Sequence, residues 1–323
     1  MPIRGMMEGA MLAALTAVLA LLGVFIPPFS LLTNLIWTIP IVVAIARNGW
    51  TVGVVTLAAA ITVIALMAGI STALILLIQF GGLGLIYGIA FRHGWSTIRA
   101  FFGGAVVVAL SFVAFLALFF VLTGLTPESL SQQVDSIPNA VIEMYRSAGL
   151  FEKYGEQGVT EESVRVLFSS IILFFKQMFP SILVTYAMLT AATNLLLSRW
   201  MLRRIGQPVT AQPPFREWRL PWQAVWVVIA GLAAALAGDY WQIPALGTAG
   251  INVLYICYPV LLILGFAVVA YLLNKYVLSP FVLSIVAVLI FLFPSLALTF
   301  VATVGLFDLV FDYRAKMDKI QGA

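Results

Sequence analysis

The sequence predicts an all-α fold, a polytopic bundle of membrane helices, from its composition and the length of its apolar runs. Of the 323 residues, 63% are hydrophobic and 9% are charged, whereas charged residues make up about a quarter of a soluble domain. Apolar runs recur at about the 20-residue length that crosses a bilayer as a helix. Helices satisfy their backbone hydrogen bonds internally, as lipid requires. The net charge of +4 therefore indicates anchoring at the lipid surface and no nucleic-acid partner.

The first apolar run, Glu8 to Pro28, predicts a helix over 6–26 with small residues along one face. Alanines recur in it at spacings of three and four, which places them on one side of a helix. Small side chains let another helix approach closely in lipid. The strip predicts a docking surface for a partner helix, with packing inside the bundle as the simpler interpretation. Its members are Ala10, Ala13, Ala14, Ala17 and Ala20.

Five further helices complete a first membrane domain over residues 1–198, and we expect them at 31–46, 51–68, 71–91, 99–122 and 166–198. Short polar breaks separate the early ones. With a cytoplasmic N-terminus, the basic residues at the helix ends fall on the cytoplasmic side, as the positive-inside rule requires. We therefore expect that orientation. The residues concerned are Arg4, Arg47, Arg92, Arg99, Arg199, Arg203 and Arg204.

The segment 123–165 is then a long, acidic loop on the outer side. Thr126, Pro127 and Glu128 predict a helix start, because they combine a capping hydroxyl, a proline at the first helical position and an acid in the first turn. Connections of this length are often functional or disordered. Two interpretations stay open: a lid over an external cavity, or a solvated loop.

A basic linker over 199–219 separates the first domain from a C-terminal block over 220–323. The linker is rich in proline and contains Trp200 and Trp218, which suits a cytoplasmic segment at the headgroup level. In the block we expect helices at 222–240 and 250–273. The apolar stretch 278–311 is too long for one straight span, and Pro294 predicts a kink or a separation into two helices. The block therefore holds three or four helices, and the whole chain nine or ten.

Neutral polar residues toward the outer half of the first domain are the candidate substrate site. Amide and indole groups facing inward suit an uncharged or zwitterionic organic ligand, although such groups also serve as hydrogen-bond partners between helices. Lys176 lies near the outer boundary, where it would contact an anionic ligand or extend to water. The candidate substrate-binding residues are Asn34, Trp37, Gln79, Lys176 and Gln177.

Sequence signatures of catalysis are absent. The chain has one cysteine and one histidine, and it contains no phosphate-binding loop, zinc-protease motif or nucleophile elbow. We therefore expect no enzymatic activity, no cofactor and no metal. A protein of this kind that transports a solute against a gradient needs energy from a separate partner.

The first domain resembles the substrate-binding S components of energy-coupling factor (ECF) vitamin transporters. The resemblance rests on six helices, the alanines in EGAMLAALTA and the double proline that follows. It implies a six-helix S-component-like bundle that binds a small-molecule nutrient near its outer face. It also implies that Ala10, Ala14 and Ala17 dock on a coupling subunit driven by ATPases, with Gln79 and Lys176 in the binding cavity.

The whole chain resembles the uncharacterised YybS-like family of bacterial membrane proteins, most clearly in the ending GLFDLVFDYR at 305–314. This implies a multi-pass protein of the bacterial plasma membrane, without a settled activity. The ending singles out Asp308, Asp312 and Arg314. The two aspartates lie one turn apart, and a solvated helix end is their simpler interpretation. The extra C-terminal helices also suit an alternative function, a membrane scaffold similar to the rod-shape protein MreD.

Overall fold

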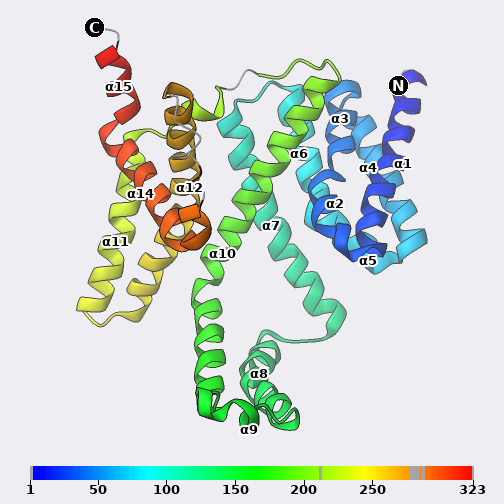
Figure 1. The fold of residues 1–323 in the computed structure, drawn as a ribbon. Helices are drawn as coiled ribbons and strands as arrows, with labels where there is room; N and C mark the ends of the chain where they lie inside the picture. Colours follow the sequence, from blue (N-terminus) through cyan, green and yellow to red (C-terminus); the bar gives the residue numbers. More distant parts are fainter. Residues whose placement is uncertain (1–2, 211–212, 277–283, 285–287, 322–323) are drawn as a thin grey trace. The chain divides into compact units, whose positions relative to one another are not determined.

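The computed structural model describes residues 3–210, 213–276, 284 and 288–321, and its regular elements in these ranges are helices (Figure 1). Eight of the described helices are long and apolar enough to cross a membrane. The chain forms two compact units. The first unit comprises Met1–Phe175 with Tyr186–Ala211, and the second comprises Lys176–Thr185 with Gln212–Ala323. The predicted class, an all-α polytopic membrane protein, is confirmed.

The first unit opens with helices close to the predicted positions. Their bounds are α1 Ile3–Phe25, η1 Pro27–Phe29, α2 Ser30–Ile36, α3 Ile39–Asn48, α4 Trp50–Ala68, α5 Ile70–Leu76, η2 Leu77–Gly81, α6 Gly82–Arg92 and α7 Thr97–Thr123. Helices α4 and α7 match continuous predicted spans. The helices predicted at 31–46 and 71–91 are present as the spans Leu32–Asn48 and Ile70–Arg92, each with a local irregularity, at Trp37 and Thr38 in the first and at the π-helical η2 in the second.

The alanine strip of α1 is divided between two faces. Ala17 is 1% exposed and lies in the core with Ala13 and Ala20, where α1 packs against α4. On the same face, the Thr56 hydroxyl donates to the Gly9 carbonyl at 3.2 Å. Ala10 and Ala14 are exposed. The simpler interpretation, internal packing, therefore describes Ala17, and only Ala10 and Ala14 remain at the surface as docking candidates.

The outer segment is helical and contacts the beginning of the next long helix. It forms α8 Pro127–Ser147, α9 Leu150–Tyr154 and η3 Gly155–Gln157, and α10 Glu161–Arg204 follows. The predicted start at Thr126 is confirmed, since its hydroxyl caps α8 by accepting from the Ser129 amide. Arg146 forms a salt bridge to Glu161 at 2.6 Å. The hydrogen bond to Glu161, together with the nearby negative charge of Glu143, raises the pKa of Arg146. Helix α8 thus contacts α10 directly.

The second unit is built from closely packed helices. It contains η4 Phe215–Glu217, η5 Trp222–Ala224, α11 Val225–Tyr240, α12 Pro244–Lys275, α14 Pro294–Phe311 and α15 Tyr313–Gln321. A Cβ on Gly250 would strike the backbone of Ala235 in α11, and one on Gly265 would strike the carbonyl of Val301 in α14. These glycines allow the helix backbones to approach as small residues do in membranes.

The predicted stretch 278–311 falls partly outside the described residues, which omit 277–283 and 285–287. Pro294 was predicted either to kink one helix or to separate two. The described residues agree with the separation. Residues 288–292 are helical, and Pro294 is the first residue of α14. The number of membrane helices, nine or ten, is left open by the residues in between.

Candidate functional site

Two helical spans with local irregularities, Leu32–Asn48 and Ile70–Arg92, meet in the first unit at the contact between Trp37 and Phe80. Trp37 lies in the turn between α2 and α3, and Phe80 lies in the π-helical η2. Their ring centroids are 6.1 Å apart with an interplanar angle of 85°. Short π-helical segments occur frequently at functional sites. We call this contact and its polar neighbours the aromatic junction.

The aromatic junction lies near half of the membrane's hydrocarbon thickness. Helix α3 has 10 residues and ends next to Arg47, and α6 has 11 residues and ends at Arg92. At 1.5 Å per residue, the junction is about 15 Å from those basic ends, about half of the roughly 30 Å hydrocarbon core. Substrate sites of many transporters lie near this depth.

Helix α10 supplies buried polar groups to the aromatic junction. The Thr38 hydroxyl donates to Asn194 Oδ1 at 2.8 Å, and the Asn194 amide donates to the Thr190 carbonyl at 3.3 Å. The Tyr87 hydroxyl donates to the Ala191 carbonyl at 2.6 Å. Thr38, Asn194 and Tyr87 are each at most 1% exposed. These neutral hydrogen bonds connect α3 and α6 to α10.

One donor at the aromatic junction has no acceptor among the residues that the structure describes. Trp37 is 0% exposed, and its indole Nε1 has no hydrogen-bond partner among the described residues. The indole N–H can only donate, and burying it unpaired costs about 1–3 kcal/mol. The Ser198 hydroxyl on α10 is likewise buried and unpartnered within the described chain. An oxygen or nitrogen acceptor from a bound molecule would satisfy the indole.

The predicted substrate-binding residues are divided between the two units. Trp37 is at the aromatic junction, Asn34 lies in α2, and Gln79 lies in η2 beside Phe80; both amides are half-buried. Lys176 and Gln177 are exposed and belong to the second unit. The structure therefore places three of the five in the same unit, two of them in contacting elements, and assigns Lys176 and Gln177 elsewhere.

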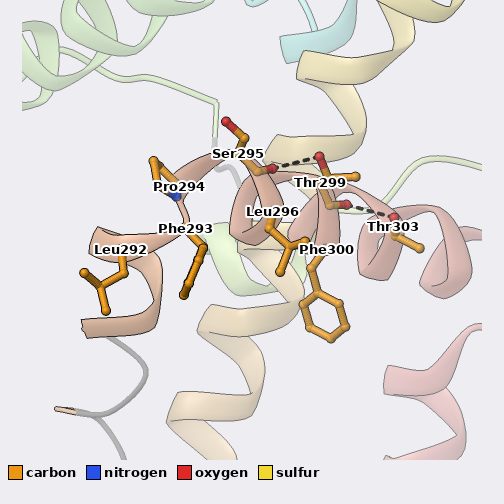
Figure 2. Close-up of a pocket in the computed structure, with 8 residues that line it drawn as sticks. All are labelled: Leu292, Phe293, Pro294, Ser295, Leu296, Thr299, Phe300 and Thr303. Carbon is orange, nitrogen blue, oxygen red and sulfur yellow. Dashed lines mark hydrogen bonds between the residues drawn. The ribbon is translucent and has the colours of Figure 1, made fainter.

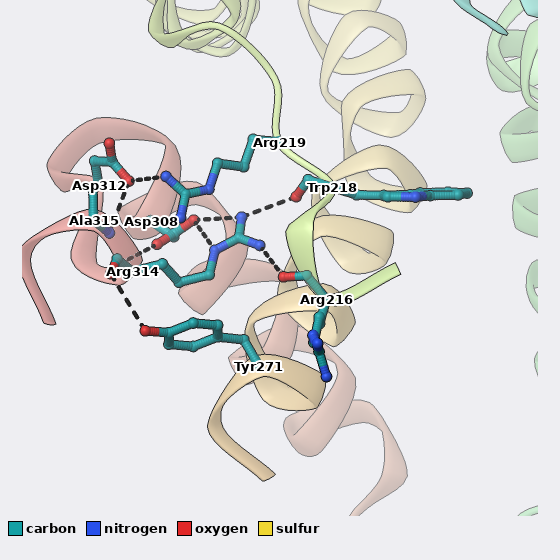
Figure 3. A network of polar contacts seen from close by, with 8 residues as sticks. All are labelled: Arg216, Trp218, Arg219, Tyr271, Asp308, Asp312, Arg314 and Ala315. Atoms are coloured by element: carbon teal, nitrogen blue, oxygen red, sulfur yellow. Dashed lines mark hydrogen bonds and ion pairs between the residues drawn. The ribbon is translucent and has the colours of Figure 1, made fainter. Parts of the chain in front are cut away.

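The C-terminal aspartates and arginine form a network that we call the clasp (Figure 3). Asp308 in α14 and Arg314 in α15 are ion-paired at 2.8 Å, with side chains 6% and 1% exposed. The Arg314 guanidinium also donates to the carbonyls of Arg216 at 2.7 Å and Trp218 at 2.9 Å. Asp308 is therefore not at a solvated helix end. The clasp joins the C-terminal helices to the preceding linker.

A second layer of the clasp is exposed. Asp312 follows the last residue of α14 with a φ of 47°, so it does not continue the helix face of Asp308. Its carboxylate accepts from Arg219 at 2.8 Å. On the first unit, the buried Arg199 donates to the Thr210 carbonyl at 2.9 Å and to the Thr97 hydroxyl. The linker is thus bound by a buried arginine in each unit.

Asn252 of α12 is a buried polar residue that the sequence did not single out. It is 8% exposed, and its side chain bonds to the backbone of α10 next to Pro180. An isolated asparagine within an apolar helix was the available signal, because buried amides in membrane helices need partners. Asn194 carries the same signal in α10.

A groove of about 840 Å³ lies at the start of α14 (Figure 2). The hydroxyls of Thr299 and Thr303 donate to the backbone carbonyls of Ser295 and Thr299, so they do not present free donors. The remaining lining is mainly apolar. It consists of Leu292, Phe293, Pro294, Ser295, Leu296, Thr299, Phe300 and Thr303. We expect this groove to face lipid.

The described residues contain no group of histidine, cysteine, aspartate and glutamate side chains suited to hold a metal ion. What the structure defines is a polytopic helical membrane protein. A family model described as "Predicted membrane protein (DUF2232)" matches residues 14–309, and the chain belongs to this family.

The chain is also 25% identical over 226 residues to "Uncharacterized protein YybS" of Bacillus subtilis (strain 168), with 69% of each chain covered. The predicted YybS-like membership is confirmed. No solved structure matches the chain, and the matches do not include an S component of an ECF transporter. Neither matching description states an activity.

Proposed function

We propose that this protein is a membrane subunit that binds a small, vitamin-like organic nutrient at the aromatic junction and takes part in its transport. The observation that carries the proposal is the fully buried Trp37 N–H, which has no acceptor in the described chain. A bound molecule with a carbonyl, ether or ring-nitrogen acceptor would complete it. The neutral surroundings, with Thr38, Asn194 and Tyr87, favour an uncharged or zwitterionic ligand.

The arrangement of the helices supports entry of a ligand to this depth. Two locally irregular helices meet there, and π-helical turns inside α-helices are frequent at functional sites. Half-buried Gln79 and Asn34 offer further amide groups on the adjoining elements. In this proposal they contact the ligand once the junction opens.

The energy for transport comes, in this proposal, from a separate ATPase module, because the sequence has no nucleotide-binding loop of its own. A coupling subunit of the ECF type docks on α1, where Ala10 and Ala14 are exposed. The N-terminus is cytoplasmic. The contact of Arg92 with the Ile45 carbonyl at 3.3 Å places the basic ends of α3 and α6 together, which supports this orientation under the positive-inside rule.

Native mass spectrometry of the gently solubilised protein from its own host tests the proposal. We expect a bound small molecule with wild type, and at least a tenfold lower occupancy with Trp37→Phe, which keeps a ring and removes the N–H. Trp200→Phe is the matched control, since Trp200 is 57% exposed on α10. Equal occupancy in all three proteins, or a protein free of small molecules under every condition, contradicts the proposal.

A membrane scaffold similar to MreD is the second candidate function, and one observation favours it. The described part of the second unit has no buried, unpartnered side-chain atom, and its helices pack at glycines, as in a purely structural assembly. Deleting 220–323 should then disrupt association with envelope-assembly proteins. If the shortened protein retains every associated protein, the scaffold function is excluded.

A further inference from the structure

Pro180 lies inside α10 and removes one of its backbone hydrogen bonds. It belongs to the segment Lys176–Thr185, which is part of the second unit. Proline has no N–H, and its ring crowds the carbonyl one turn earlier, so a helix bends or opens at this point. The freed backbone groups need other partners wherever they are shielded from water. The second unit provides those partners from a single side chain, Asn252.

The Asn252 carboxamide binds backbone groups of α10 on both sides of Pro180. Its Oδ1 accepts from the Ser181 amide at 2.9 Å, and its Nδ2 donates to the Gln177 carbonyl at 2.9 Å. A further 2.9 Å bond from Nδ2 to the Thr248 carbonyl fixes the side chain on α12. Ser181 is 1% exposed, so water has little access. The amide is therefore held in one orientation by three hydrogen bonds.

Gln177 and Ser181 are also natural partners of each other. In an α-helix the N–H of a residue bonds the carbonyl four positions earlier, which for Ser181 is the Gln177 carbonyl. Two arrangements of the same two groups are thus available: bridged through Asn252, or bonded directly. A side chain inserted into this ladder bends a helix. The two arrangements give α10 two different bends.

We propose that Asn252 of the second unit sets the bend of α10 and thereby regulates the aromatic junction. Asn194, which accepts from Thr38 at the junction, is on the same helix as Ser181. It lies about 20 Å further along at 1.5 Å per residue. Bridging holds the Thr38–Asn194 contact in the closed arrangement, and release of Asn252 shifts it. The regulatory meaning rests on the proposed function, whereas the coupling between Asn252 and Trp37 does not.

The coupling is measured without a ligand, by 19F NMR of the full-length protein labelled with 5-fluorotryptophan. The chain has 8 tryptophans, and Trp37→Phe assigns the Trp37 signal. We expect Asn252→Ala to move this signal or split it into two. Asn274→Ala is the matched control, because Asn274 is a surface amide on the same helix that accepts from Arg216. It should leave the Trp37 signal in place.

A double-variant comparison separates coupling from general damage. Pro180→Ala restores an N–H to α10, so Asn252→Ala in that background should move the Trp37 signal less than half as far. Asn252→Asp retains an acceptor for Ser181 and loses the donor to Gln177. This variant replaces Asn252→Ala in the experiment if Asn252→Ala does not fold. A Trp37 signal unmoved in folded Asn252 variants, or moved equally with and without Pro180, overturns the inference. Loss of ligand binding alone would contradict only the proposed function.

Discussion

The aromatic junction of the first unit and the clasp of the second unit both bury polar groups, but they differ in how completely these groups are hydrogen-bonded. The junction uses neutral groups and leaves the Trp37 N–H without an acceptor in the described part of the chain. The clasp buries a full ion pair, and the Arg314 guanidinium satisfies Asp308 and two backbone carbonyls at once. A saturated network fixes one geometry, whereas a missing acceptor leaves a position for another molecule. The comparison favours a structural role for the clasp and agrees with the ligand site proposed at the junction.

The largest effect should come from breaking the clasp at Arg314. Arg314→Ala leaves the Asp308 carboxylate buried without its cation, which costs about 3–5 kcal/mol of unfolding free energy. It also frees the Arg216 carbonyl, so trypsin should cut after Arg216 faster than in wild type. Unfolding in mixed micelles and timed proteolysis measure the two effects. Unchanged stability and cleavage would mean that the clasp does not hold the linker.

A medium loss of unfolding free energy is expected when the hydrogen bond between Thr38 and Asn194 is removed. Thr38→Val keeps the shape of the side chain and removes the donor to Asn194 Oδ1, so it should cost about 1–3 kcal/mol of unfolding free energy. Thr62→Val is the control, since the Thr62 hydroxyl is exposed and bonds only within its own helix, to the Ala58 carbonyl. Equal losses in both variants, measured by the same micelle titration, would show that the Thr38–Asn194 contact contributes nothing specific.

The exposed layer of the clasp should contribute less than its buried layer. Arg219 and Asp312 have side chains 39% and 56% exposed, and such pairs contribute about 0.2–1 kcal/mol. Arg219→Ala should therefore cost no more than this, and the loss should shrink further as salt screens the pair. Unfolding titrations at low and high salt measure it. A loss as large as that of Arg314→Ala would mean that both layers act as one network.

The smallest effect is expected at the unpartnered hydroxyl of Ser198. Ser198→Ala removes a buried oxygen that makes no hydrogen bond within the described chain, so the unfolding free energy should stay within about 0.5 kcal/mol of wild type or rise. The same titration checks it. A loss comparable to that of Thr38→Val would reveal a partner for Ser198, such as an ordered water, and would weaken the contrast between the two regions.

The sequence predicted the membrane class and most spans, because long apolar runs and basic helix ends follow directly from lipid chemistry. The irregularities at Trp37 and at Leu77–Gly81 were not foreseen, although Thr38 and Pro40 follow the first and Gln79 and Gly81 lie in the second. A π-helical turn has no composition signal of its own. The start of α8 at Thr126, by contrast, was predictable from capping chemistry that involves only neighbouring residues.

Candidate residues were predicted with uneven success because burial depends on partners far along the chain. Trp37 and Gln79 were named for their polarity, and the structure puts them in contacting elements, but Asn194 was missed. Its partner Thr38 is distant in the sequence. Asp308, Asp312 and Arg314 were named together, yet the role of Arg314 depends on carbonyls of the linker. Backbone acceptors of this kind have no signature in the sequence.

The length of α10 gives the protein reach beyond the lipid. Its 44 residues span about 66 Å at 1.5 Å per residue, roughly twice the hydrocarbon thickness of about 30 Å. Counted from the basic end at Arg204, the hydrocarbon is crossed by about 20 residues. The rest of the helix continues past the headgroups and carries α8 through Arg146 and Glu161. A molecule that binds the Arg146 end of α8 would therefore be held about 30 Å away from the hydrocarbon surface.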